Sequence, residues 1–156
     1  MRRHLANTIR EALIVTIIAA VVGIGVNAVR DDGIPLVASP EDFSVSTKAE
    51  LMRIQDARKL FDEGAAVFVD ARSAEGFSRK HIEGAINIEP TGNLDDFRWL
   101  AKTDAYIITY ASRETQRQAG VVADRLIDIG CSKVYVLRGG LEAWLEAGLP
   151  AGEQEN

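Results

Sequence analysis

The stretch that decides the fold is AYIITYASRETQRQAGVVADRL, residues Ala105–Leu126. Its first six residues, Ala105–Tyr110, form an apolar run with the length of a buried strand. The polar segment Ala111–Arg117 follows, and an apolar-periodic helix begins within or just after it. A strand, a short loop and a helix N-terminus together predict an anion cradle, because backbone N–H groups and the positive end of the helix dipole meet there.

Strands and helices alternate on both sides of this stretch. Three further strands are expected at Ala66–Val69, where Asp70 ends the apolar run, and at Ala85–Ile88 and Lys133–Leu137. Helices are expected from the capping box Thr47-x-x-Glu50 to Gly64, from Asn93 to Lys102 and over Leu141–Ala147, with Ala71–Glu83 irregular. The two tryptophans, Trp99 and Trp144, fall on apolar helix faces and are expected in the core.

This alternation is typical of a parallel sheet that helices cover on both faces, an α/β fold. Ligands of such sheets bind at the carboxyl ends of the strands. The loops that follow Asp70 and Tyr110 both carry charge, and we expect them to be neighbours.

The composition excludes several classes of function. The net charge is −5, and residues 1–30 carry +3, so residues 31–156 carry −8, which argues against a nucleic-acid partner. Cys131 is the only cysteine, so neither an intramolecular disulfide nor a cysteine-based metal site can form. His4 and His81 have no metal-ligating neighbour at a useful spacing, and we expect no metal and no cofactor.

Residues 12–29, ALIVTIIAAVVGIGVNAV, are 18 apolar residues without charge. As a helix they would span about 27 Å, close to the hydrocarbon core of a bilayer. Arginines lie before the segment, and Asp31 and Asp32 follow Arg30, so the positive-inside rule predicts a single-pass inner-membrane protein with residues 1–11 in the cytoplasm and the remainder in the periplasm. The alternative is a signal peptide cleaved after Val26-Asn27-Ala28, which would release a secreted protein.

After this segment, residues 30–45 contain Pro35, Pro40 and several acids, and predict a linker. The folded domain is expected over residues 46–151, with a polar, frayed tail over 152–156.

Two further stretches carry a family resemblance. VDARSAEGFSRKHIEGAINI, Val69–Ile88, is similar to the first signature of rhodanese-like domains, and CSKVYVLRGGLEAWLEAGLP, Cys131–Pro150, resembles their closing stretch. The resemblance implies a three-layer α/β sandwich around a central parallel five-stranded sheet. One membrane helix before such a domain also resembles membrane-anchored bacterial members of the family.

The resemblance implies sulfur transfer through a cysteine persulfide, with the cysteine first in the loop after the fourth strand. Ala111 stands at that position, and alanine cannot form a thiolate. What remains is a degenerate nucleophile position framed by Asp70 and Arg72. The candidate anion-binding loop consists of Ser112, Arg113, Glu114, Thr115, Gln116 and Arg117.

Three hypotheses stay open at this point. The first is a catalytically inactive, membrane-tethered module that binds a partner protein or a small anion. The second is a residual sulfurtransferase or sulfur- and redox-handling enzyme that uses Cys131 or a thiol of a partner. The third is a subunit of a membrane complex, held by residues 12–29 in contact with lipid.

Overall fold

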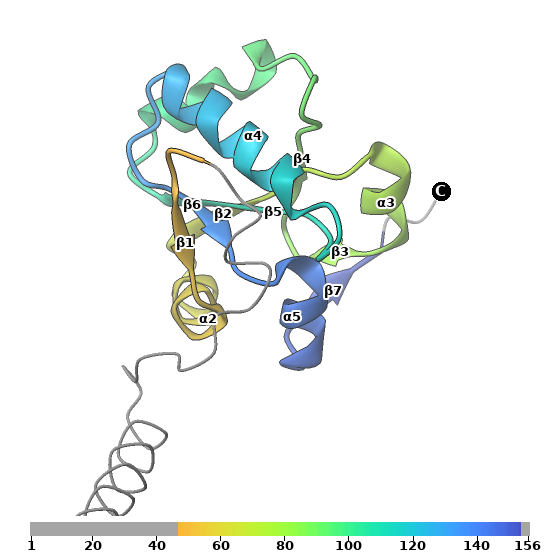
Figure 1. The fold of residues 1–156 in the computed structure, drawn as a ribbon. Coiled ribbons are helices and arrows are strands. Elements are labelled where there is room, and N and C mark those ends of the chain that lie inside the picture. Colours follow the sequence, from red (N-terminus) through yellow and green to blue (C-terminus); the bar gives the residue numbers. More distant parts are fainter. Residues whose placement is uncertain (1–46, 154–156) are drawn as a thin grey trace, which may run out of the picture. The chain divides into compact units, whose positions relative to one another are not determined.

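The computed structural model describes residues 47–153, and its centre is a five-stranded sheet (Figure 1). The strands are β1 (Glu50–Met52), β2 (Ala66–Asp70), β4 (Ile86–Asn87), β5 (Tyr106–Tyr110) and β6 (Val134–Leu137). Their order in the sheet is β1-β6-β5-β2-β4, and every neighbouring pair is parallel. The expected α/β fold with a parallel five-stranded sheet is therefore confirmed.

Helices cover both faces of this sheet. They are α2 (Ile54–Asp62), α3 (Ala74–Arg79), α4 (Gln116–Asp128) and α5 (Gly140–Glu146), with a 3-10 helix, η2, at Asp95–Lys102. In Figure 1, α4 lies on one side of the sheet, and α2 and α5 lie on the other. The strand alternation explains why both faces need cover: Ile107 points into one hydrophobic cluster, whereas Ile108 and Tyr110 point into the other.

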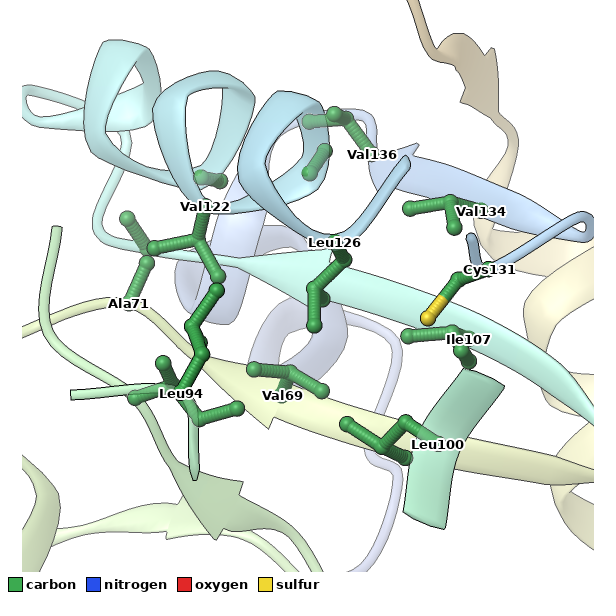
Figure 2. Close-up of a cluster of buried hydrophobic side chains, with 14 residues drawn as sticks. Val69, Ala71, Leu94, Leu100, Ile107, Val122, Leu126, Cys131, Val134 and Val136 are labelled. Carbon is green, nitrogen blue, oxygen red and sulfur yellow. The ribbon is translucent and has the colours of Figure 1, made fainter. Parts of the chain in front are cut away.

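We call the two clusters the α4-side and the α5-side cluster. The α4-side cluster, shown in Figure 2, joins α4 and η2 to the sheet through residues such as Val122, Leu126 and Leu100. The α5-side cluster contains Trp144, which is fully buried, as the sequence led us to expect. Trp99 is the opposite case, because 47% of it is exposed on η2, so its expected place in the core was wrong.

The domain also contains a second sheet, which has two strands. Its strands β3 (His81–Ile82) and β7 (Ala151–Gly152) pair antiparallel, with His81 opposite Gly152. Gly152, expected to begin a frayed tail, thus belongs to the folded domain, because its backbone pairs with that of His81, which lies 71 positions earlier in the chain.

Two other local expectations were wrong. The capping box does not form: Thr47 Oγ1 donates to Asp124 on α4 (2.6 Å), and Glu50 opens β1. Parallel pairing with β6 holds Glu50–Met52 extended, so the helix starts only at Ile54. The segment expected to be irregular contains α3, whose N-cap Ser73 accepts a hydrogen bond from the N–H of Gly76 (3.3 Å).

The predicted membrane segment, residues 12–29, and the linker, residues 30–45, lie outside the described residues. Within residues 47–153, no helix combines the length and apolar character needed to cross a bilayer.

Candidate functional site

The candidate loop leaves the carboxyl end of β5 and enters α4. Asp70 stands opposite Tyr110 in the register of β2 and β5, and the N–H of Ala71 donates to the carbonyl of Tyr110 (2.7 Å). The loops that follow these two strands are therefore neighbours, as expected from the parallel sheet. The site lies at the edge where ligands of such sheets bind.

Ala111, the first residue of the loop, is fully buried and belongs to the α4-side cluster. Its carbonyl accepts a hydrogen bond from the N–H of Leu141 in the first turn of α5 (2.9 Å). Gly140 makes this approach possible: its φ is +62°, and a Cβ there would lie 2.3 Å from the Ala111 oxygen. The first loop position therefore presents a methyl group to the core and offers no reacting atom.

Inside the loop, one hydroxyl group accepts a backbone hydrogen bond and pairs with a second hydroxyl group. The hydroxyls of Ser112 and Thr115 lie 2.6 Å apart, and the N–H of Thr115 donates to Ser112 Oγ (3.2 Å). Gln116 is buried, and its Nε2 donates to the carbonyl of Leu137 (2.7 Å). These three residues shape the loop and tie it to the end of β6.

Arg113 connects the loop to α5 through two carboxylates. Its N–H donates to Glu142 Oε2 (2.7 Å), and its guanidinium donates to both oxygens of Glu146 (2.9 and 3.0 Å). A carboxylate of the chain itself thus occupies one N–H group of the cradle. The other two candidates, Glu114 and Arg117, are exposed.

No role for Glu142 and Glu146 was predicted from the sequence. Their spacing of four residues, just after Gly139-Gly140, places them on one face of a short helix. That face meets the loop only because α5 starts against Ala111, and this contact links residues about 30 positions apart.

Asp70, which is fully buried, and Arg72, which is mostly buried, form an ion pair beside the loop. Arg72 donates from Nε to both Asp70 oxygens (3.0 and 3.2 Å) and from Nη2 to Oδ2 (2.6 Å), and it also bonds the carbonyl of Lys80. Tyr110 shares this network: its hydroxyl accepts from the N–H of Ile82 (3.0 Å). Burial, together with the nearby Asp70 carboxylate, raises the pKa of Tyr110 well above its usual value, so the phenol stays neutral.

Cys131 lies at the opposite end of the sheet. It precedes β6, whereas Ala111 follows β5, and the two strands run parallel with Ile107 opposite Val134. A five-residue strand separates the two ends by about 16 Å. In Figure 2, Cys131 stands at one end of the α4-side cluster and Ala71, which follows β2, at the other. Cys131 is 5% exposed, and burial raises the pKa of its thiol.

The His81 side chain contacts the backbone and the ring of Phe77. Its Nδ1 lies 2.9 Å from the carbonyl oxygen of Phe77, and its ring stacks on the Phe77 ring with centroids 4.1 Å apart. Among residues 47–153, no group of three or more histidine, cysteine, aspartate or glutamate side chains is placed to hold a metal ion. His4 lies outside this range.

The sequence model of the rhodanese-like domain matches residues 53–147, well over half of the chain. The chain therefore belongs to the rhodanese-like family. Both signature stretches fall within the structure just described: the first contains the Asp70–Arg72 pair, and the second contains β6, Gly140 and Trp144.

The chain is also similar to individual proteins. The uncharacterized protein YibN of Escherichia coli is 25% identical over 111 residues, which cover 69% of this chain and 75% of YibN. Thiosulfate sulfurtransferase GlpE of Pseudomonas fluorescens is 35% identical over 98 residues, which cover 62% of this chain and 86% of GlpE. Among solved structures, the BH2092 protein of Bacillus halodurans superposes with a TM-score of 0.57 at 27% identity, over 67% of this chain and 77% of that protein.

Proposed function

We propose that this chain is a catalytically inactive rhodanese-like module that binds a partner protein or a small anion. Residues 12–29 hold it in the inner membrane, with its N-terminus in the cytoplasm and its domain in the periplasm. A single membrane helix followed by a binding domain also suits a subunit of a membrane complex. The apolar length of residues 12–29 and the arginines before them support the tether.

The observation that carries the inactivity is the buried Ala111 at the head of the loop. Sulfur transfer through an enzyme persulfide needs a thiolate at the point where the loop amides and the helix N-terminus converge. Ala111 supplies only a methyl group there, and the N–H of Arg113 already binds Glu142. The name of GlpE describes an activity of that relative, and this chain keeps the scaffold without the reacting atom.

The alternative enzyme, with Cys131 as nucleophile, fits the geometry poorly. The Cys131 thiol is buried, and its raised pKa lowers the thiolate fraction at neutral pH. It lies at the amino end of β6, away from the loop, Asp70 and Arg72. We therefore place sulfur chemistry by Cys131 second.

A thiosulfate–cyanide assay on the purified full chain tests the inactivity. We expect no thiocyanate formation above the rate without protein, because no exposed thiolate is available to accept the sulfane sulfur. The matched variant is Cys131→Ala, which removes the only thiol of the chain and should behave identically. Turnover that survives in Cys131→Ala would contradict the proposal, and turnover that disappears with it would move the chain to the enzyme alternative.

Purification from native membranes through a C-terminal tag, followed by mass spectrometry, tests the tether and the partner. We expect an uncleaved N-terminus and a co-purifying membrane or periplasmic protein. Arg117→Glu, which reverses the charge of an exposed loop residue, should reduce the amount of partner recovered by several-fold. Arg98→Glu, on the exposed surface of η2, is the control and should leave recovery unchanged.

Two outcomes of this purification would contradict the proposal. A mature chain that begins after Ala28 would show a cleaved signal peptide and a secreted protein. Equal recovery of partner with Arg117→Glu and Arg98→Glu would show that the loop is not the contact surface.

A further inference from the structure

Thr47 and Lys48, the first residues that the structure describes, are bonded to the outer surface of α4. Thr47 Oγ1 donates to Asp124 Oδ1 (2.6 Å), and the N–H of Lys48 donates to the same oxygen (2.7 Å). Lys48 Nζ donates to Asp128 Oδ1 (2.6 Å), one turn further along the helix. These bonds fix the point at which the segment before Thr47 joins the domain.

The two aspartates belong to one stripe of residues along α4. The helical spacing of three and four residues places positions 117, 121, 124 and 128 on one face. These residues, which we call the outer stripe, are Arg117, Val121, Asp124 and Asp128. The face that carries Leu126 points the other way, into the α4-side cluster. The outer stripe is therefore a surface of the domain, and the entering chain binds both of its aspartates.

The bonds of the entering chain step along this stripe in one direction. The side chain of Lys48 reaches Asp128. Thr47, one residue earlier, meets Asp124, one turn closer to the start of α4. Thr47 Oγ1 also lies 3.4 Å from the carbonyl oxygen of Gly120, a further turn back. The residues just before Thr47 are therefore directed along the outer stripe, toward the start of the helix.

Val121 is the next position on the stripe in that direction. It is 42% exposed, and within residues 47–153 Trp99 is the other large apolar residue with such exposure. A single exposed valine needs no partner of its own. This one, however, lies directly beside the path of the entering chain, so the side chains of that segment decide whether it is covered.

The sequence before Thr47 supplies apolar side chains at a suitable spacing. The four residues FSVS stand directly before it, and in them Phe43 and Val45 alternate with serines. In an extended segment, such alternate residues share one face. At about 3.3 Å per residue, Val45 can lie up to about 7 Å from Thr47. Val121 lies about 4.5 Å along the helix axis from the aspartate that Thr47 binds, so the two valines are within reach.

We infer that residues 43–46 dock along the outer stripe of α4, with Val45 and Phe43 covering Val121. The occupant of this face is thus a segment of the chain itself. The bonds to Asp124 hold one end of the segment, and the apolar contact with Val121 holds the rest. Burial of these side chains is favourable because it removes apolar surface from water.

Docking of residues 43–46 also sets the length of the tether in the proposed function. Residues 30–42 then remain between the membrane segment and the domain, and thirteen residues span at most about 45 Å. The tether leaves the domain toward the start of α4, the end at which the candidate loop enters this helix. This consequence rests on the proposed tether, whereas the docking itself does not.

Disulfide cross-linking of the full chain in non-ionic detergent tests the docking. Val45→Cys and Val121→Cys are combined with Cys131→Ala, so that one disulfide at most can form within a chain. Copper–phenanthroline and air oxidise the two thiols, and mass spectrometry follows the linked peptide over time. We expect this pair to cross-link about tenfold faster than a control pair, because docking raises the effective concentration of one thiol near the other.

The control pair combines Val45→Cys with Ser132→Cys in the same background. Ser132 is exposed and also lies near the chain entry, because it lines a pocket together with Lys48 and Ala49. A segment without a fixed position would reach both partner cysteines at similar rates. Equal rates, a faster control pair or no disulfide in either pair would each overturn the inference.

Hydrogen exchange provides a second readout, which needs no added cysteine. Val121→Glu places a charge beneath the docked segment and should raise the exchange rate of the amides in residues 43–46 several-fold. Val121→Leu keeps the surface apolar and should leave these rates unchanged. Because Val121 is exposed, neither variant should unfold the domain, which far-UV circular dichroism checks. Amides that exchange equally fast in the wild type and in Val121→Glu would contradict the docking, whereas partner recovery from membranes tests the proposed function separately.

Discussion

Trp144→Ala is expected to lower the free energy of unfolding by about 3–5 kcal/mol, the range for a large aromatic side chain removed from a core. Trp144 is fully buried and meets Phe61 and Phe68 edge-on, with ring centroids 5.3 and 5.1 Å apart. Its Nε1 also donates to the carbonyl of Pro150 (2.9 Å), just before β7. Alanine removes all of these contacts at once and leaves a cavity between α5 and the sheet.

The control is the other tryptophan. Trp99→Ala removes the same side chain from a site where 47% of the residue is exposed, and we expect it to cost no more than about 1 kcal/mol. Urea unfolding followed by far-UV circular dichroism compares the two variants without dependence on tryptophan fluorescence. Equal losses of stability would contradict the assignment of Trp144 to the core.

Asp70→Ala is the second substitution with a large expected effect. It leaves the Arg72 guanidinium, only 16% exposed, without the carboxylate that it holds through Nε and Nη2. Removing one partner of a buried ion pair costs about 3–5 kcal/mol, because the remaining charge is poorly solvated. The loss should appear as a lower urea midpoint with an unchanged slope.

Asp95→Ala is the matched control for this pair. Asp95 also binds an arginine, Arg98, at 3.1 Å, but both side chains are about two-thirds exposed. Pairs of this kind contribute about 0–1 kcal/mol, so the control should unfold almost at the wild-type midpoint. The proposed role of the Asp70–Arg72 pair fails if the two variants lose similar stability.

Much of the fold was predictable from local pattern. Short apolar runs before Asp70, Tyr110 and Arg138 are buried strands, because a parallel sheet covered on both faces needs strands that are apolar on both sides. The alternation of strands and helices predicted the parallel arrangement. From the same alternation we could predict that the loop lies between β5 and α4 and that it is close to the end of β2.

Long-range pairing decided the parts that local pattern missed. The sequence Thr47-x-x-Glu50 is typical of a helix start. In the structure, however, Glu50 pairs with Tyr135 of β6, and this pairing holds the backbone of β1 extended. Gly152 looked like part of a polar tail, but His81 pairs with it. Trp99 has the spacing of a core residue, but η2 is a 3-10 helix of eight residues, whose turn differs from that of an α-helix.

The site was predictable to a similar degree. The sequence placed Ala111 at the start of the loop and Asp70 near it, because both follow strands. It gave no sign that Glu142 and Glu146 bond the loop. Those contacts depend on strand order and on the path of α5, and single-sequence periodicity carries no information on either.

The contacts around Ala111 also affect the rigidity of the loop, because they form a closed ring of hydrogen bonds that starts at Ala111 and returns to Tyr110. Ala111 bonds the start of α5, Trp144 within α5 bonds the carbonyl before β7, and β7 pairs with β3. Ile82 in β3 donates to the hydroxyl of Tyr110, which is the covalent neighbour of Ala111. A partner that displaced the base of the loop would have to strain all of these hydrogen bonds together. The base of the loop therefore acts as a rigid anchor, and any adaptation to a partner is left to the exposed side chains beyond it.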